Sequence, residues 1–268
     1  TATTEIYTLS LHDALPISRL LDRLAPDIAS GALQVIVMSD HGQITLEGAD
    51  RERAHRDERR NQECQYHRVP AGNRRPGGQH QREGDGQGSG ERRPPGTWTF
   101  AAIEPLFDAI VDRLDGRQTA YTLYGHSAGS QFVHRFLYFV PEARVSRAIA
   151  ANAGWYTMPD LATGYPYGLK DSAVTREMLE QAMQRPLTIL LGEDDTDPEH
   201  PSLRRTPEAL AQGLHRFARG QAFFAAGQAA SLDLGVPFAW QLATVPGADH
   251  DNRLMAPAAI PYLLDAKP

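Results

Sequence analysis

The sequence predicts an α/β fold, a mostly parallel sheet flanked by helices, in which the N-terminal half of the sheet is incomplete or disordered. Apolar runs of strand length alternate with helical stretches from residue 97 onward, which is typical of βαβ units. The run LTILL at 187–191 is apolar throughout, as expected of a strand buried on both faces of a parallel sheet. Residues 51–96 contain eleven arginines and no Leu, Ile, Met, Phe or Trp, and such a segment cannot bury enough apolar surface to fold.

The N-terminal fifty residues divide into two parts. Residues 1–18, TATTEIYTLSLHDALPIS, resemble a translated sequencing adapter and are expected to be a non-native leader, with a short native strand and turn as the alternative. Residues 19–50 are expected to be a short structured remnant. Within them we expect a helix over 19–25, a strand over 34–38 and a hairpin partner of that strand over 44–46.

Residues 51–96 are expected to be a disordered Arg- and Gly-rich segment, either a solvated linker or a stretch read out of frame. An RNA-binding tail is the alternative, because arginine attracts phosphates without a fixed structure. Such tails usually lie at termini and lack interspersed glutamates, so we favour the linker or frame-shift interpretation. The glycine pattern at 84–90, GDGQGSG, mimics a dinucleotide fingerprint, but it follows no expected strand and opens no expected helix.

Periodicity and chain-breaking residues place the elements from residue 97 onward. Strands are expected over 119–124, 147–152, 187–191 and 240–245, and helices over 99–114, 128–140, 175–183, 206–234 and 254–264. Pro105 marks either a kink or a late start of the first helix. The stretch over 206–234 is expected to be largely helical, with Gly213, Gly220 and Gly227 weakening it at seven-residue intervals.

Composition argues against several classes of protein. The 268 residues carry a formal net charge of −6 and a pI near 5.9, which argues against a nucleic-acid binder. A single cysteine, Cys64, excludes an internal disulfide and a multi-cysteine metal site. Apolar runs are all shorter than the roughly 18 residues of a membrane-spanning helix, and the N-terminus lacks the features of a secretion signal. We therefore expect a cytoplasmic protein with no nucleic-acid or membrane partner.

The strongest motif is Gly125-His126-Ser127-Ala128-Gly129, a G-x-S-x-G pentapeptide between an expected strand and an expected helix. This context is that of a nucleophile elbow, a turn so tight that a side chain at either glycine would strike neighbouring backbone. The serine hydroxyl is thereby exposed at a helix N-terminus, and the N–H of Ala128 is expected to donate to an oxyanion. An ordinary N-cap serine in a glycine-rich turn is the alternative.

A serine nucleophile needs a histidine base and an acid that orients it, which in α/β-hydrolases follow in the order serine, acid, histidine. An acidic cluster follows the strand at 187–191, and His250 follows the strand at 240–245. We expect His250 to be the base and Asp195, three residues after Gly192, to be the acid, with Asp197 as the alternative acid. The cluster resembles a calcium loop only in part, since it lacks the remaining ligand spacing and glycine of such loops, and we expect no metal.

Four other histidines compete less well for the role of base. They are His126, inside the elbow, His134 and His215, on expected helices, and His200. Histidines on helices serve more often in the core or on the surface than in catalysis.

Five stretches carry a resemblance to a known family: YGHSAGSQFVHRF (124–136), ANAGWYTMPD (151–160), LGEDDTDP (191–198), RRTPEALAQGLHRFARGQAFF (204–224) and VPGADHDN (245–252). They resemble the poly(3-hydroxyalkanoate)-depolymerase-like esterases of the α/β-hydrolase superfamily, over about residues 98–264. The resemblance implies that 97–268 is the catalytic core. It also implies that Trp155 and Tyr156, together with His126, line the substrate pocket, although core packing is an equal alternative for the two aromatic residues.

The sequence departs from this family before the elbow. The family has further strands there, one of which leads into a loop with the second oxyanion donor. His41-Gly42, after the apolar run at 34–38, is the candidate remnant of that loop, with Gly42 as the donor. If the first half of the sheet is missing, the elbow strand becomes an exposed edge.

Taken together, the sequence predicts a serine hydrolase that cleaves carboxylic esters, small or oligomeric, through Ser127, His250 and Asp195 and an acyl-enzyme, without a cofactor. A thioesterase or peptidase of the same fold is an alternative, because the same triad serves all three chemistries. A hydrolase remnant without activity is the alternative from another class.

Overall fold

The structure, a computed structural model, describes residues 36–39, 99–113 and 115–263. Its elements, in chain order, are β1 (Ile36–Ser39), η2 (Thr99–Ala102), α3 (Ile103–Arg113), β2 (Tyr121–His126), α4 (Ala128–Phe139), β3 (Val145–Ala151), α5 (Arg176–Met183), β4 (Leu187–Gly192), α6 (Pro207–Gln212), α7 (Arg216–Leu234), β5 (Trp240–Val245) and α8 (Asn252–Leu263). The expected leader at 1–18, the helix at 19–25, the hairpin partner at 44–46 and the segment at 51–96 lie outside the described residues.

The described strands form one sheet in the order β1-β2-β3-β4-β5, and every neighbouring pair is parallel. This confirms the predicted parallel α/β fold. The strand expected at 34–38 is present as β1, and it pairs with β2 from Ile36 opposite Thr122 to Ser39 opposite Gly125. The elbow strand β2 is therefore not an edge of the described sheet, because β1 pairs with it, and the condition under which it would be exposed is not met.

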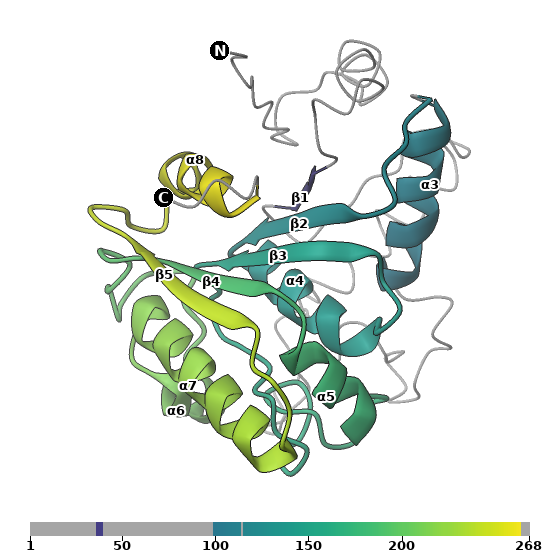
Figure 1. The fold of residues 1–268 in the computed structure, drawn as a ribbon. Coiled ribbons are helices and arrows are strands. Elements are labelled where there is room, and N and C mark those ends of the chain that lie inside the picture. Colours follow the sequence, from purple (N-terminus) through teal and green to yellow (C-terminus); the bar gives the residue numbers. More distant parts are fainter. Residues whose placement is uncertain (1–35, 40–98, 114, 264–268) are drawn as a thin grey trace, which may run out of the picture.

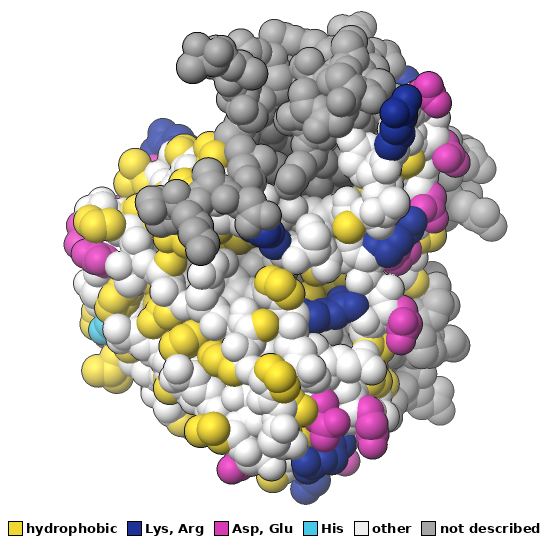
Figure 2. Space-filling view, viewed as in Figure 1, with side chains coloured by type: hydrophobic (Ala, Val, Ile, Leu, Met, Phe, Trp, Pro, Cys, Tyr) yellow, Lys and Arg dark blue, Asp and Glu magenta, His cyan; other side chains and the backbone are white. Residues whose placement is uncertain are grey.

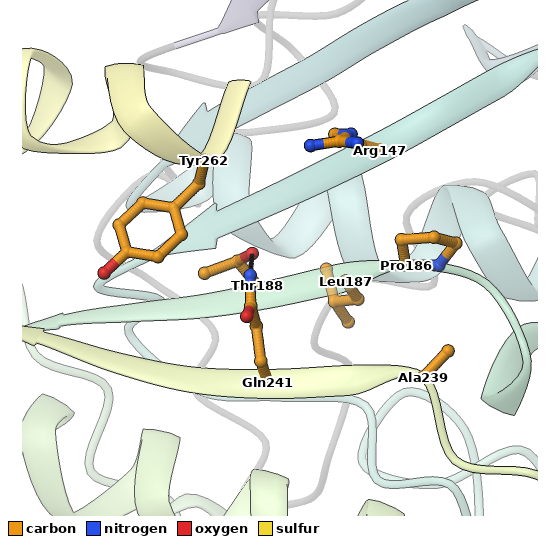
Figure 3. A pocket seen from close by; sticks show the side chains of 7 residues that line it. All are labelled: Arg147, Pro186, Leu187, Thr188, Ala239, Gln241 and Tyr262. Carbon is orange, nitrogen blue, oxygen red and sulfur yellow. Dashed lines mark hydrogen bonds between the residues drawn. The ribbon is translucent and has the colours of Figure 1, made fainter. Parts of the chain in front are cut away.

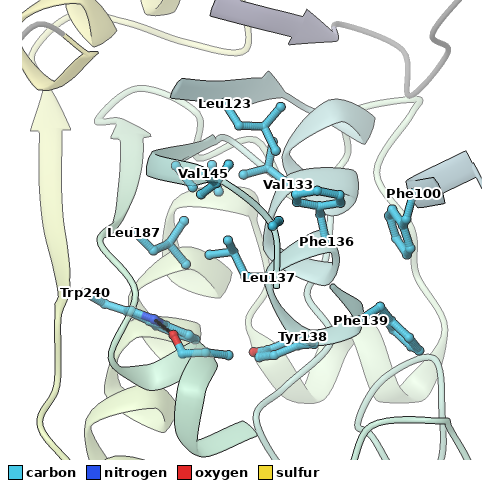
Figure 4. Packing of buried hydrophobic residues seen from close by; sticks show 14 of the residues in the cluster. Phe100, Leu123, Val133, Phe136, Leu137, Tyr138, Phe139, Val145, Leu187 and Trp240 are labelled. Atoms are coloured by element: carbon cyan, nitrogen blue, oxygen red, sulfur yellow. Dashed lines mark hydrogen bonds between the residues drawn. The ribbon is translucent and has the colours of Figure 1, made fainter. Parts of the chain in front are cut away.

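Helices cover the two faces of the sheet unequally. The helices α4, α5 and α7 lie on one face, and α8 lies on the other, over the ends of β2, β3 and β4 (Figure 1). Because side chains alternate along a strand, Leu123 points into the core under α4 whereas Tyr124 points toward α8. The larger core gathers aromatic residues of α4 around Phe136 and extends to Trp240 on β5 (Figure 4).

Most expected elements form close to the predicted residues, with one exception. The first helix begins at Ile103 after a 3-10 turn, so Pro105 lies in its first turn, in agreement with a late start. The stretch 206–234 is largely helical, as expected, but it forms two helices: α6 ends at Gln212, because Gly213 has a φ of 147°, and α7 begins after the N-cap residue His215.

Candidate active site

The turn between β2 and α4 holds Ser127 in an unusual conformation. Its φ is 56°, a value that strains a residue with a side chain. A Cβ atom at Gly125 would lie 2.2 Å from the carbonyl oxygen of Gly129, so strand and helix approach this closely because position 125 is glycine. Ser127 is the N-cap residue of α4, but its hydroxyl is directed to His250 instead of the amides of that helix. The interpretation as an ordinary N-cap serine does not fit this geometry.

Three side chains from three loops form a continuous hydrogen-bonded chain at the C-terminal ends of β2, β4 and β5. Nε2 of His250 lies 3.0 Å from Oγ of Ser127, and Nδ1 of His250 lies 2.8 Å from Oδ2 of Asp195. A carboxylate only accepts hydrogen bonds, so Nδ1 carries the proton and Nε2 is free to accept the serine proton. The arrangement has the geometry required to activate a hydroxyl as a nucleophile.

The surroundings of His250 favour its neutral form. Burial lowers the pKa of the imidazole below its ordinary value, while the hydrogen bond to Asp195 acts in the opposite direction. The positive charge of Arg216 and the proximity of His126 lower the pKa of His250 further. A neutral imidazole is the form that can take up a proton from serine.

Within the acidic loop after β4, only the carboxylate of Asp195 among the described side chains faces His250. Asp197 is exposed, and its Oδ1 accepts a hydrogen bond of 2.8 Å from the N–H of Glu199, which closes a turn. Glu193 accepts from the hydroxyl of Thr244. In the described part of the chain, no group of three His, Cys, Asp or Glu side chains is arranged to hold a metal ion.

Two of the competing histidines have structural positions. His134 is buried on α4, where Nδ1 lies 2.8 Å from the carbonyl of Ser130 and Nε2 accepts from the N–H of Thr157. His215 was expected within a helix, but it is the N-cap residue of α7 and its Nδ1 accepts from the N–H of Ala218.

The other two competing histidines flank the site. The ring of His126, which is buried, lies 4.7 Å from the ring of His250 between centroids, and the ring of His200 lies 5.7 Å from it in an edge-on arrangement. The ring of His126 thus lies beside that of His250, and its role in a substrate pocket stays a prediction.

The aromatic pair at 155–156 is buried. Tyr156 belongs to the hydrophobic core, where its ring stacks on Phe223 at 4.4 Å. Trp155 lies between the guanidinium groups of Arg135, at 4.5 Å, and Arg204, at 4.8 Å. The position of Tyr156 corresponds to the core-packing alternative, whereas Trp155 is buried among charged partners. The predicted pocket role of the two residues stays a prediction.

Of the two predicted oxyanion donors, Ala128 lies within the described residues and Gly42 does not. Ala128 opens α4 directly after Ser127, and the first amides of a helix have no intrahelical partner. The candidate second donor, Gly42, lies outside the described residues. Its predicted position follows β1, which ends at Ser39 beside Gly125 of the elbow.

Two residues near the site were missed by the sequence analysis. Asn152, at the end of β3, accepts a hydrogen bond of 2.8 Å from the N–H of Gly192 and donates one of 3.0 Å to the carbonyl of Asp249. Arg216, in the first turn of α7, donates to Oδ1 of Asp195 at 3.2 Å. The only sequence signal for Arg216 was its place in the stretch at 204–224 that resembles the esterases.

A shallow depression lies far from this site, at the N-terminal ends of the strands. It is lined by residues before and within β3, β4 and β5 and by α8: Arg147, Pro186, Leu187, Thr188, Ala239, Gln241 and Tyr262 (Figure 3). On the face seen in Figure 2, hydrophobic side chains are scattered over the middle of the molecule, and most charged side chains lie along its right side and lower edge. Since Ser127 lies at the opposite ends of the strands, this depression is not the candidate active site.

None of the helices in the described residues is long and apolar enough to cross a membrane.

Two solved structures of hydrolases are similar to this chain. Poly(aspartic acid) hydrolase-1 from Sphingomonas sp. KT-1 is similar with a TM-score of 0.65 and 50% sequence identity, over 65% of this chain and 66% of that chain. LpqC, a poly(3-hydroxybutyrate) depolymerase from Bordetella parapertussis, is similar with a TM-score of 0.63 and 37% identity, over 67% of this chain and 62% of that chain. The chain thus spans less than two thirds of either protein. No family model and no curated protein matches the chain.

Proposed function

The chain has the α/β-hydrolase fold, and from this premise we propose that it is a serine hydrolase that cleaves carboxylic esters. In this proposal Ser127 is the nucleophile, His250 the general base and acid, and Asp195 the residue that orients His250. The observation that carries the proposal is the hydroxyl of Ser127, which lies 3.0 Å from Nε2 of His250 although the residue stands at the N-cap of a helix.

The reaction has two halves. Oγ of Ser127 attacks the acyl carbon while Nε2 of His250 takes the hydroxyl proton, and Asp195 stabilises the imidazolium that forms. The N–H of Ala128, with that of Gly42 as the candidate second donor, stabilises the oxyanion. The attack forms a tetrahedral intermediate that carries this oxyanion. Its collapse breaks the ester bond and leaves the acyl group on Ser127, and the leaving alcohol takes the proton from His250. Water, deprotonated by His250, then attacks the acyl-enzyme, and the acid leaves as Ser127 regains its proton.

Two named relatives and the chemistry of the triad bear on the proposed substrate class. One similar protein is named as a hydrolase of poly(aspartic acid), whose units are joined by amide bonds, and the other as a depolymerase of a polyester. Small or oligomeric esters are the class that we propose for this chain, because an ester is the less demanding acyl substrate. Thioester and amide cleavage by the same triad are the alternatives.

Labelling with a fluorophosphonate probe tests the nucleophile. Wild type should be labelled and should hydrolyse p-nitrophenyl butyrate, and Ser127→Ala should lose the label and lower kcat by about 10⁴-fold or more. Ser130→Ala is the matched control, because Ser130 is a buried serine one turn further along α4. It should retain the label.

Absence of labelling in folded wild type, or equal labelling of Ser127→Ala, would overturn the proposal. In the first case, the chain would be a remnant without a working site. Comparing the p-nitrophenyl ester with the matching thioester and anilide then ranks the three acyl chemistries for an active enzyme.

A further inference from the structure

The carboxylate of Asp195 divides its two oxygens between two different partners. Oδ2 accepts from Nδ1 of His250 at 2.8 Å, and Oδ1 accepts from Nη1 of Arg216 at 3.2 Å. The side chains of Asp195 and Arg216 are 3% and 2% exposed, so this ion pair is shielded from water. The main chain reinforces it, because the N–H of Phe217 donates to the carbonyl of Asp195 at 3.2 Å. The first turn of α7 therefore holds Asp195 by both its side chain and its backbone.

The second arm of Arg216 extends the contact toward the site. Nη2 donates to Oγ of Ser202 at 2.8 Å and lies 3.3 Å from Nδ1 of His200. Oγ of Ser202 and Nδ1 of His200 are themselves 3.0 Å apart, and the ring of His200 lies edge-on to that of His250. A planar guanidinium with donors in a fixed fork can hold two partners at a set angle, which a lysine cannot do.

Stability alone is a weak reason for such a pair. Taking two charges out of water costs several kcal/mol, and a buried ion pair often contributes no net stability compared with apolar residues of similar volume. The position of this pair, directly behind the histidine of the candidate triad, points instead to a role in the reaction.

We propose that Arg216 is a positioning residue of the triad, which acts through Asp195 by fixing its carboxylate through Oδ1 so that Oδ2 faces His250. This inference rests on the proposed function, and it assigns a role to a residue outside the three that react. It has two consequences, one geometric and one electrostatic.

The geometric consequence concerns the orientation of the imidazole. A carboxylate bound on one oxygen cannot rotate freely, so Oδ2 stays in place as the acceptor for Nδ1–H and Nε2 stays directed at Ser127. The electrostatic consequence concerns charge. The positive charge of Arg216 offsets the negative charge of Asp195. The protonated form of His250 is therefore less favoured than it would be if Asp195 were not paired with Arg216.

Other charged and titratable groups also face His250 and must remain constant in the test. They are His126 at the end of β2 and Asp195 and His200 in the loop after β4. In the loop after β5, Asp249 and Asp251 are the chain neighbours of His250. The test therefore changes only Arg216 and leaves these groups in place.

The experiment compares Arg216→Gln and Arg216→Lys with wild type in the pH dependence of kcat/KM on p-nitrophenyl butyrate. Arg216→Gln removes the charge, so the pKa of His250 should rise. The acid limb, the low-pH side of the plot of kcat/KM against pH, should then shift to a pH about one unit higher. Its plateau should fall about tenfold or more, because the carboxylate is released. Arg216→Lys keeps the charge without the fork, so its acid limb should stay near that of wild type while the plateau is lowered.

Arg219→Gln is the matched control. Arg219 lies on the same helix and is equally buried, but its guanidinium donates to the carbonyls of Gly213 and Gly154. Its substitution should reduce stability in urea and leave the acid limb where it is in wild type. Titration of the His250 ring by NMR gives the same comparison without turnover, so it decides the inference even if the enzyme is inactive.

The outcomes separate the two proposals. If wild type is active and the acid limb of Arg216→Gln lies at the same pH as that of wild type, the proposed role of Arg216 is overturned and the proposed function stands. Equal shifts in Arg216→Gln and Arg219→Gln would also overturn it, since any loss of a buried charge would then suffice. Inactive wild type whose His250 titration still moves on Arg216→Gln would overturn the proposed function alone.

Discussion

Asn152 shows how a single side chain can hold two loops in register. It directly follows β3 and has a φ of 47°, in the left-handed region that asparagine tolerates better than most residues. Its side chain joins the N–H of Gly192, at the start of the loop that carries Asp195, to the carbonyl of Asp249, next to His250. A Cβ atom at Gly192 would lie 2.4 Å from the carbonyl oxygen of Ala248, so these two loops pack backbone against backbone.

The first prediction concerns this residue. Asn152→Ala should lower the free energy of unfolding by about 2–4 kcal/mol, because two hydrogen bonds of about 1 kcal/mol each are lost and alanine is strained at a positive φ. Asn152→Gly removes the same hydrogen bonds without the strain, so it should be about 1 kcal/mol more stable than the alanine variant in urea unfolding. Both should lower kcat/KM by about tenfold at a temperature where they are folded. A wild-type kcat/KM in the glycine variant would show that the loops keep their positions without Asn152.

The convergence of Ser127, Asp195 and His250 could be predicted because each follows a strand in a short local pattern. Parallel strands end at one edge of a sheet, so their following loops meet, and the structure places the three side chains within hydrogen-bonding distance. Their catalytic roles stay a proposal. Arg216 and Asn152 could not be found this way, because a guanidinium on a helix and an amide after a strand acquire their partners only when the chain is folded.

The elements α6 and α7 show how far periodicity can go. The sequence over 206–234 predicts a largely helical stretch that three glycines weaken, but it does not show which of the three ends a helix. The structure shows that the φ of 147° at Gly213 redirects the chain, and the ring of His215 then caps the new helix. The other two glycines of the pattern have a different role, since both lie where α7 touches the sheet. A Cβ atom at Gly220 would lie 2.3 Å from Cδ2 of Leu191, and one at Gly227 would lie 2.7 Å from the ring of Trp240.

The second prediction follows from this close approach. Helix propensity alone favours Gly220→Ala by about 1 kcal/mol, but the added methyl group overpacks the contact with the buried Leu191, at a cost of about 1–3 kcal/mol. We therefore expect Gly220→Ala to lower the free energy of unfolding by about 1 kcal/mol in urea.

Two further variants control this prediction. Leu191→Val combined with Gly220→Ala should recover part of the loss, as coupled neighbours do. Ala229→Gly, at an exposed position of α7, reports the propensity effect alone and should cost about 1 kcal/mol. A stabilised Gly220→Ala protein would mean that α7 can move away from β4 without loss.

At the scale of the whole molecule, the strand order explains where the candidate site lies. Sequential strands β2 to β5 bring the loops after β2, β4 and β5 to one edge, while the depression of Figure 3 lies at the other. The sequence predicted the parallel sheet but not that β1 would pair with β2. The two strands are separated by residues 40–120, and nothing in the run Ile36–Ser39 specifies its neighbour.

The global stability of the fold should depend on pH through His134. This residue lies in the larger core, where its ring contacts Tyr156 and Phe223, and its two nitrogens face the carbonyl of Ser130 and the N–H of Thr157. Burial holds the pKa of His134 well below its ordinary value. Since the unfolded chain takes up a proton near pH 6.5 and the folded protein does not, the stabilising contribution is present above that pH and is lost as the pH falls toward the folded pKa.

The third prediction is that wild type loses about 1 kcal/mol more stability than His134→Gln between pH 7 and pH 5.5, measured by urea unfolding. Glutamine keeps one donor for Ser130 and one acceptor for Thr157 but has no proton to gain in this range. Between pH 7 and 8 the imidazole is neutral in both states, so the difference between the two proteins should be constant there, which serves as the internal control. The other histidines are common to both proteins and cancel in the comparison. Parallel stability curves down to pH 5.5 would mean that His134 binds a proton in the folded protein, and the core around Phe223 would then have to admit a charge.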